Sequence, residues 1–164
     1  MDNDCCLLSV DCWLNMDKET ALKKMIHYCD YQDRCKKEIF TKLDTFELDD
    51  YDRDFIIDFL RDEGFINDER YCRSFVKGKL NLKKWGVNKI KLSLITKGVD
   101  REIIDNVLSE IDKDSYKEEL VNLLKNKKIN EDDPYKRKAK LIRYAVGKGY
   151  SISEVMEIVN GKEQ

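Results

Sequence analysis

The chain has 164 residues, 41% of them hydrophobic and 39% charged, which allows a buried core beneath a very polar exterior. Its 33 acidic and 31 basic residues nearly balance, so it is not a uniformly basic or acidic protein. One proline and seven glycines leave long stretches without breakers, which favours α-helix over a loop-rich or all-β fold.

The N-terminal segment, residues 1–16, does not have the pattern of a secretory leader. Asp2 and Asp4 stand where a basic region would be, and Asp11 interrupts a short apolar run. No stretch approaches the roughly 20 apolar residues that a membrane-spanning helix needs. We therefore expect a cytoplasmic protein without a membrane contact. Whether residues 1–16 are ordered is left open.

The six cysteines include no two with C-x-x-C spacing. The single histidine, His27, cannot complete a familiar Cys/His metal site with them. Thiols at apolar positions of a cytoplasmic chain, such as Cys35 and Cys72, are typical small core residues. His27 is expected on a helix surface. The sequence thus predicts no metal and no cofactor.

The spacing of apolar residues is helical. Tyr71, Cys72, Phe75 and Val76 recur at i, i+1, i+4 and i+5, one stripe of an amphipathic helix that Asn67 can cap. No segment alternates with period two. The sequence predicts an all-α fold.

Later helices carry their own start and stop signals. Val87, Ile90 and Leu94 share one face of a helix that should end at Gly98, and Asp100 can cap the next. The apolar face of that next helix is formed by Ile103, Ile104, Val107 and Leu108. Pro134 after Asp133 marks another start, and Ser151 to Glu154 has the spacing of a capping box.

The chain also looks internally repeated. "EIFTKL" (38–43) aligns with "SLITKG" (93–98), and Ile-Ile-Asp follows each at 56–58 and 103–105. A fainter third copy runs through "RYAVGKGYSISEVMEIV". Chance similarity between short helical stretches is the alternative. We expect three tandem three-helix repeats, residues 17–65, 66–111 and 112–164, stacked into an elongated, curved body.

Residues 59–108, "FLRDEGFINDERYCRSFVKGKLNLKKWGVNKIKLSLITKGVDREIIDNVL", closely resemble the core of the RecX family, bacterial regulators of the RecA recombinase. The similarity lies in Gly-Phe ending an acidic helix, "NDERY", "FV" leading into basic residues, "KGV", and a helix that begins with an acid and Ile-Ile. Upstream, "ALKKMIHYCDYQDRCKKEIFTKL" looks like the first helix pair of the family. The resemblance implies a non-enzymatic regulator that binds RecA and the single-stranded DNA within its filament. We expect a monomer, because the units of such a repeat stack on their neighbours along the chain.

Charge is strongly segregated along the chain. Residues 1–65 hold 17 acids and 9 bases, residues 66–99 hold 2 and 9, residues 100–133 hold 11 and 6, and residues 134–164 hold 3 and 7. From Arg70 to Val99 there are nine bases and no acid. Such separation predicts a dipolar surface whose basic lobe faces phosphates or an acidic protein.

The basic stretch supplies most of the candidate contacts to nucleic acid or to the RecA filament. These are Arg70, Arg73, Lys77, Lys79, Lys83, Lys84, Trp85, Lys89 and Lys91. Basic residues near an exposed aromatic suit a surface that follows a nucleic-acid backbone. The alternative is an ordinary solvated helix face, with Trp85 as a core plug between repeats.

A second basic cluster completes the candidate set: Arg137, Lys138, Lys140 and Arg143. Leu141, Ile142, Ala145 and Val146 should form the opposite, core-facing side of the same helix. If the repeats curve, the two basic clusters could share one concave wall.

Signals of catalysis are missing from the sequence. It contains no Gly-rich phosphate loop, no G-x-S-x-G and no H-E-x-x-H, and the acids of 44–63 lack the glycine and spacing of an EF-hand loop. Two functions remain open. One is a RecX-like modulator that inhibits RecA filament assembly, ATP hydrolysis and strand exchange; the other is a helical nucleic-acid-binding module that acts without RecA.

Overall fold

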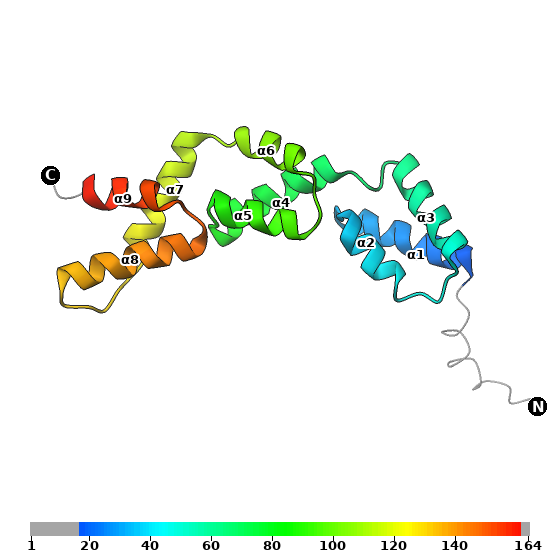
Figure 1. Cartoon of the computed structure of the whole chain (residues 1–164), viewed down its shortest axis with the longest axis horizontal. Helices are drawn as coiled ribbons and strands as arrows, with labels where there is room; N and C mark the ends of the chain where they lie inside the picture. The colour runs from blue at the N-terminus through cyan, green and yellow to red at the C-terminus, as the bar shows by residue number, and fades with distance from the viewer. Residues whose placement is uncertain (1–16, 162–164) are drawn as a thin grey trace, which may run out of the picture. The chain divides into compact units, whose positions relative to one another are not determined.

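The structure, a computed structural model, describes residues 17–161; the predicted N-terminal segment 1–16 lies outside them, as do residues 162–164. The described residues form nine α-helices and no strands (Figure 1). The prediction of an all-α fold is confirmed. The helices are α1 (Lys18–Tyr31), α2 (Lys36–Leu43), α3 (Asp50–Asp62), α4 (Asp68–Lys83), α5 (Val87–Thr96), α6 (Arg101–Ser109), α7 (Lys113–Asn126), α8 (Pro134–Lys148) and α9 (Ile152–Asn160).

The chain divides into two compact units, with the boundary between Tyr71 and Cys72 inside α4. The limits of the three predicted repeats and their stacking into an elongated, curved body stay predictions. None of the described helices is long and apolar enough to cross a membrane.

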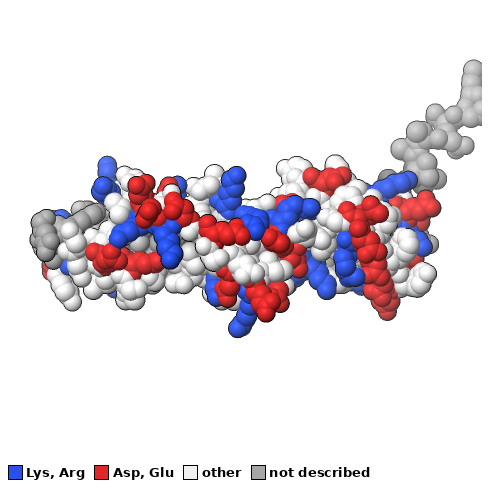
Figure 2. Space-filling model, turned by 90° about the horizontal axis from the view of Figure 1, so that it is seen from above, with Lys and Arg blue, Asp and Glu red and all other residues white. Residues whose placement is uncertain are grey.

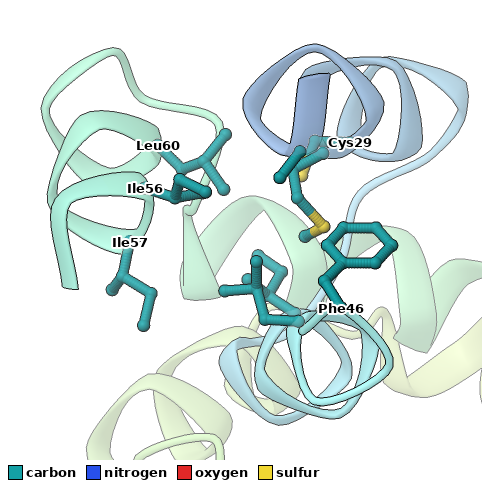
Figure 3. Close-up of a cluster of buried hydrophobic side chains, with 9 residues drawn as sticks. Cys29, Phe46, Ile56, Ile57 and Leu60 are labelled. Carbon is teal, nitrogen blue, oxygen red and sulfur yellow. The ribbon is translucent and has the colours of Figure 1, made fainter. Parts of the chain in front are cut away.

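The N-terminal unit is built on α1, α2 and α3. Asp17 and Asp49 cap α1 and α3 by accepting from the amides of Thr20 and Asp52, at 2.6 and 2.8 Å. Ile56 and Leu60 of α3 point towards Cys29 of α1 and towards Phe46, which follows α2 (Figure 3). This buried cluster holds the three helices together.

The side chains of Cys35, Cys72 and His27 lie where the sequence predicts them. Cys35 is buried, as is Cys72 at the boundary, and both carry free thiols, so the prediction that they are core residues is confirmed. His27 is exposed on α1, as predicted. Among the described residues no three His, Cys, Asp or Glu side chains gather in a position to hold a metal ion.

The helices from α4 onwards begin and end at the predicted capping residues. Asn67 accepts from the amide of Arg70 at 2.8 Å, Asp100 from that of Glu102 at 2.8 Å, and Gly98 has the left-handed φ of 80°. Asp133 caps α8 with Pro134 in its first turn, and Ser151 and Glu154 form a complete capping box on α9. These local predictions are confirmed.

Some predicted core residues lie less deeply than expected. Tyr71, Cys72 and Val76 of α4 are buried, but Phe75 is only half-buried, with the ammonium groups of Lys79 and Lys97 at 4.9 and 5.8 Å from its ring centroid. Val146 of α8 is 41% exposed, while Ala145 beside it is fully buried. Its assignment to the core face was wrong, since the helix turns Ala145 rather than Val146 towards α7 and α9.

A close backbone contact joins the start of α5 to the turn between α8 and α9, which lie beside each other in Figure 1. The Gly86 amide donates to the Lys148 carbonyl at 2.9 Å, and the Asn88 amide donates to the Gly149 carbonyl at 3.1 Å. A Cβ atom on Gly86 would lie 2.2 Å from the Gly149 carbonyl carbon. Glycine at both positions is therefore what lets the two backbones meet.

Candidate nucleic-acid interface

The predicted site begins at Arg70, which is engaged inside the N-terminal unit. Its Nε donates to Asp33 at 2.6 Å, and its Nη2 donates to the carbonyls of Gly64 and Phe65 at 3.2 and 3.4 Å. These bonds tie the loop before α4 to the end of α1. Arg70 is thus occupied with local structure in this conformation.

Three further candidates pair with acids of the segment 100–133. Arg73 forms a two-pronged ion pair with Glu110, Lys84 meets Glu119 at 2.8 Å, and Lys91 meets Asp105 at 2.5 Å. Hydrogen bonds from Arg73 hold the pKa of the Glu110 carboxyl below its ordinary value.

These pairs partly undo the segregation that the sequence predicts. Basic residues of 66–99 neutralise acids that come next in the chain, since α6 and α7 fold back beside α4 and α5. On the face seen in Figure 2, acidic and basic side chains are interspersed rather than gathered into separate lobes. Exposed pairs of this kind contribute about 0–1 kcal/mol each, so they can exchange for phosphate at little cost.

The remaining candidates converge on Trp85. The ammonium groups of Lys79 and Lys89 lie 5.0 and 4.7 Å from the Trp85 ring centroid, and that of Lys79 also lies 4.9 Å from the ring of Phe75. We call Phe75, Lys79, Trp85 and Lys89 the lysine–aromatic column. Cations held over aromatic faces are fixed in position while their N–H groups stay available to an anion.

Trp85 holds this place because of the bend between α4 and α5. Lys84 adopts a positive φ of 52°, and the Trp85 amide donates to the Lys79 carbonyl at 3.1 Å, which ends α4. Trp85 is half-buried. Trp85 is therefore neither a fully buried core residue between repeats nor a fully exposed ring. Part of the ring is buried, and the ammonium groups of Lys79 and Lys89 lie close to it.

Lys77 and Lys83 complete the basic row of α4. Both are exposed, and among the described residues neither forms an ion pair. Lys77 lines a cavity of about 340 Å³ together with Val107 and Tyr116. Lys83, one helical turn beyond Lys79, adds unpaired positive charge to the lysine–aromatic column, whereas Lys77, two residues from both Phe75 and Lys79, lies on a different face of α4.

The second predicted cluster lies on α8 before the residues that contact the start of α5. Lys140 pairs with Glu131 at 2.7 Å, and Arg137 donates to the Glu131 carbonyl at 2.5 and 2.8 Å. Arg137 precedes Gly147 by ten residues, about 15 Å along a helix. Lys138 and Arg143 lie on the same helix, half-buried and exposed respectively.

The residues that α8 brings to the lysine–aromatic column are therefore not the predicted ones. Lys148 Nζ donates to the Lys83 carbonyl and Lys89 Nζ donates to the Gly147 carbonyl, both at 3.4 Å. A basic surface shared by α4, α5 and α8 would therefore include Lys148, and not the predicted residues of α8. The only sign of a role for Lys148 in the sequence is that it follows Tyr144 by four residues, which places both on one face of the helix.

Lys97 and Lys127 were also missed. Lys97 lies 5.8 Å from the Phe75 ring centroid, and Lys127 lies 4.6 Å from that of Tyr144. Both pairings join separate helices or loops, so no local sequence pattern announces them.

Comparison with known proteins places this chain. Residues 67–108 match the RecX second three-helix domain, and residues 124–159 match the RecX third three-helix domain. The Regulatory protein RecX of Clostridium botulinum (strain Eklund 17B / Type B) is 41% identical over 124 residues, 71% of this chain and 57% of that protein. That of Clostridium beijerinckii is 38% identical over 133 residues, 77% of this chain and 60% of that protein.

The match extends further along other relatives. The Regulatory protein RecX of Clostridium acetobutylicum is 34% identical over 145 residues, 85% of this chain and 67% of that protein. The crystal structure of RecX from Lactobacillus salivarius superposes with a TM-score of 0.77 at 26% identity, covering 89% of this chain and 96% of that one. The chain thus spans a little over half of the first curated relatives and nearly all of this solved one. The helices from α4 onwards include the second and third three-helix domains of RecX, and the chain belongs to the RecX family.

Proposed function

We propose that this chain binds the RecA–single-stranded DNA filament as a cytoplasmic monomer and inhibits filament assembly, ATP hydrolysis and strand exchange. Its relatives carry the name of regulatory proteins, which supports regulation rather than catalysis. The lysine–aromatic column is the single observation that best supports a nucleic-acid contact within that role.

The chemistry of the column fits a DNA backbone. Ammonium groups donate to phosphate oxygens and release the counterions that the phosphates had condensed, which makes binding favourable at low salt. Lys83 and Lys148, which are joined through the Lys83 carbonyl, extend the positive charge beyond Trp85. A chain that prefers one state of the filament shifts the assembly equilibrium towards that state, in proportion to its differential affinity.

A titration of RecA's single-stranded-DNA-dependent ATPase tests this proposal. We expect the chain to lower the rate at less than one copy per RecA, because one bound molecule acts on a filament and not only on one subunit. Binding to the same DNA without RecA is measured in parallel, under the same salt.

The two functions left open by the sequence separate in this experiment. If the chain binds DNA yet leaves the ATPase unchanged even in excess over RecA, the nucleic-acid module that acts without RecA is correct.

A further inference from the structure

A polar groove lies beside the lysine–aromatic column, between α7 and the later part of α8. It has a volume of about 450 Å³, and its lining consists of Leu123 and six polar or charged residues: Lys84, Glu119, Asn122, Asn126, Lys127 and Tyr144. Sites for small organic groups commonly measure about 300–1,000 Å³. We call it the α7–α8 groove.

The groove repeats the arrangement found at Trp85. An aromatic ring, here Tyr144, carries two ammonium groups: Lys127 Nζ at 4.6 Å and Lys148 Nζ at 5.8 Å from its centroid. The two ring sites are connected, because Lys148 Nζ also donates to the carbonyl of Lys83, two residues before Trp85. Lys84 lies in the groove and is the neighbour of Trp85 in the chain. Positive charge therefore continues from one ring to the next.

Two side-chain amides distinguish the groove from a simple phosphate site. Asn122 and Asn126 are four residues apart on α7 and so lie on one face, one turn from each other. Both are exposed, and within residues 17–161 neither amide makes a hydrogen bond. A carboxamide offers two donors and an acceptor, the complement of the edge of a nucleobase.

Glu119 adds an acceptor of the same kind. Its charge is balanced by Lys84 at 2.8 Å, so it does not repel a polyanion as a lone carboxylate would. A carboxylate can accept from the exocyclic amino group of a base. A half-buried tyrosine, two amides and a neutralised acid together match the way proteins bind bases that are splayed out of a single strand.

We propose that the α7–α8 groove receives an unstacked nucleobase of a single strand, with the adjoining phosphates on Lys127 and Lys148 while Lys84 stays paired with Glu119. This inference rests on the proposed DNA contact at Trp85 and extends it. The strand runs from the Trp85 ring across Lys148 to the Tyr144 ring, and the amides contact the base edge.

The test compares a single-stranded oligonucleotide with an abasic one of the same length, at one salt concentration, by fluorescence anisotropy on the full chain. Both strands carry the same phosphates, so the ratio of their affinities reports the bases alone. We expect the base-bearing strand to bind at least about tenfold more tightly, from stacking and edge contacts.

The double variant Asn122→Ala with Asn126→Ala should reduce that ratio about threefold to tenfold and leave the affinity for the abasic strand unchanged. Alanine is a better helix former than asparagine, so α7 should fold normally, which circular dichroism verifies. Asn106→Ala with Asn160→Ala, two exposed asparagines outside the groove, is the matched control and should leave the ratio as in the parent.

The possible failures are distinguishable. A parent chain that binds both strands equally, or groove variants with an unchanged ratio, would overturn the base site and leave the phosphate contact at Trp85 standing. A parent chain that binds neither strand would overturn the base site and the DNA contact of the proposed function together.

Discussion

Phe75 illustrates how the neighbours of a single side chain set its contribution to stability. Its place in the apolar stripe of α4 suggests a core residue, yet its ring is only partly buried, with the ammonium groups of Lys79 and Lys97 close to it. Phe→Ala in a full core costs about 3–5 kcal/mol. For Phe75→Ala we expect a loss at or below the lower end of that range, about 3 kcal/mol, because part of the ring is already in contact with water.

Ile90→Ala is the comparison for that prediction, because Ile90 is fully buried and should lose about 2–5 kcal/mol. Denaturant unfolding of both variants gives the two losses. If Phe75→Ala proves the more damaging by several kcal/mol, the ring is a core residue and the lysines over it are incidental.

Tyr116 ties α7 to the start of α5, since its hydroxyl accepts from the Val87 amide at 3.1 Å. Burial raises the pKa of the Tyr116 phenol to about 12, although the Val87 amide, which favours the phenolate, opposes this. In an unfolded chain a tyrosine titrates near about 10. The unfolded state therefore loses its proton first, and the contribution of Tyr116 to stability, complete below pH 10, declines between about pH 10 and 12.

We accordingly expect the stability difference between the parent and Tyr116→Phe to be constant up to about pH 10 and to shrink towards pH 12. Denaturant midpoints measured across that range provide the check. A difference that stays constant through the whole window would mean that the phenol is not shielded from water.

Local features of the helices could be predicted from the sequence because short-range chemistry determines them. Asn67, Asp100, Gly98 and the Ser151 capping box each act within a few residues of their own position. The partial burial of Phe75 and the exposure of Val146 depend on what other helices place against them. No pattern along one helix contains that information.

At the scale of elements, the contact of Gly86 with Gly149 is the joint that fixes α5 against α8 and α9. The Gly86 N-cap position of α5 has no side-chain cap, and carbonyls at the end of α8 accept from the amides there instead. This arrangement needs both backbones to approach without an intervening Cβ.

Gly86→Ala should therefore lower the free energy of unfolding by about 1–3 kcal/mol or more, the cost of overpacked sites. The added Cβ would collide with backbone atoms, which cannot rotate away as a side chain can. Gly78→Ala is the matched control. Nothing lies within 4 Å of the Cβ it would add in the middle of α4, so it should stabilise the chain by up to about 1 kcal/mol. Similar thermal midpoints for the two variants would show that the joint is loose.

Over the chain as a whole, the charge pattern of the sequence located the basic residues, but it did not indicate which of them pair with acids of the same chain. Arg70, Arg73, Lys84 and Lys91 pair with acids, and these partners could not be foreseen because they lie 14 to 37 residues away in sequence. The candidate interface narrows to the lysine–aromatic column with Lys83 and Lys148. It keeps four of the predicted residues, Lys79, Lys83, Trp85 and Lys89, and adds Phe75 and Lys148.

In the proposed complex, the lysine–aromatic column contacts DNA phosphates in the RecA filament. The most direct measurement is the salt dependence of binding to the filament, for the parent and for Lys79→Gln with Lys89→Gln. Each lost phosphate contact should lower the slope of log affinity against log salt by about 0.7, so the double variant should lose about 1.4.

The control is Lys113→Gln with Lys125→Gln, two exposed lysines of α7 with the same change of charge. We predict that the control keeps the parent's slope and its inhibition of RecA, while the column variant binds weakly with a flatter slope and normal helicity. Equal slopes and equal inhibition for all three proteins would contradict the account.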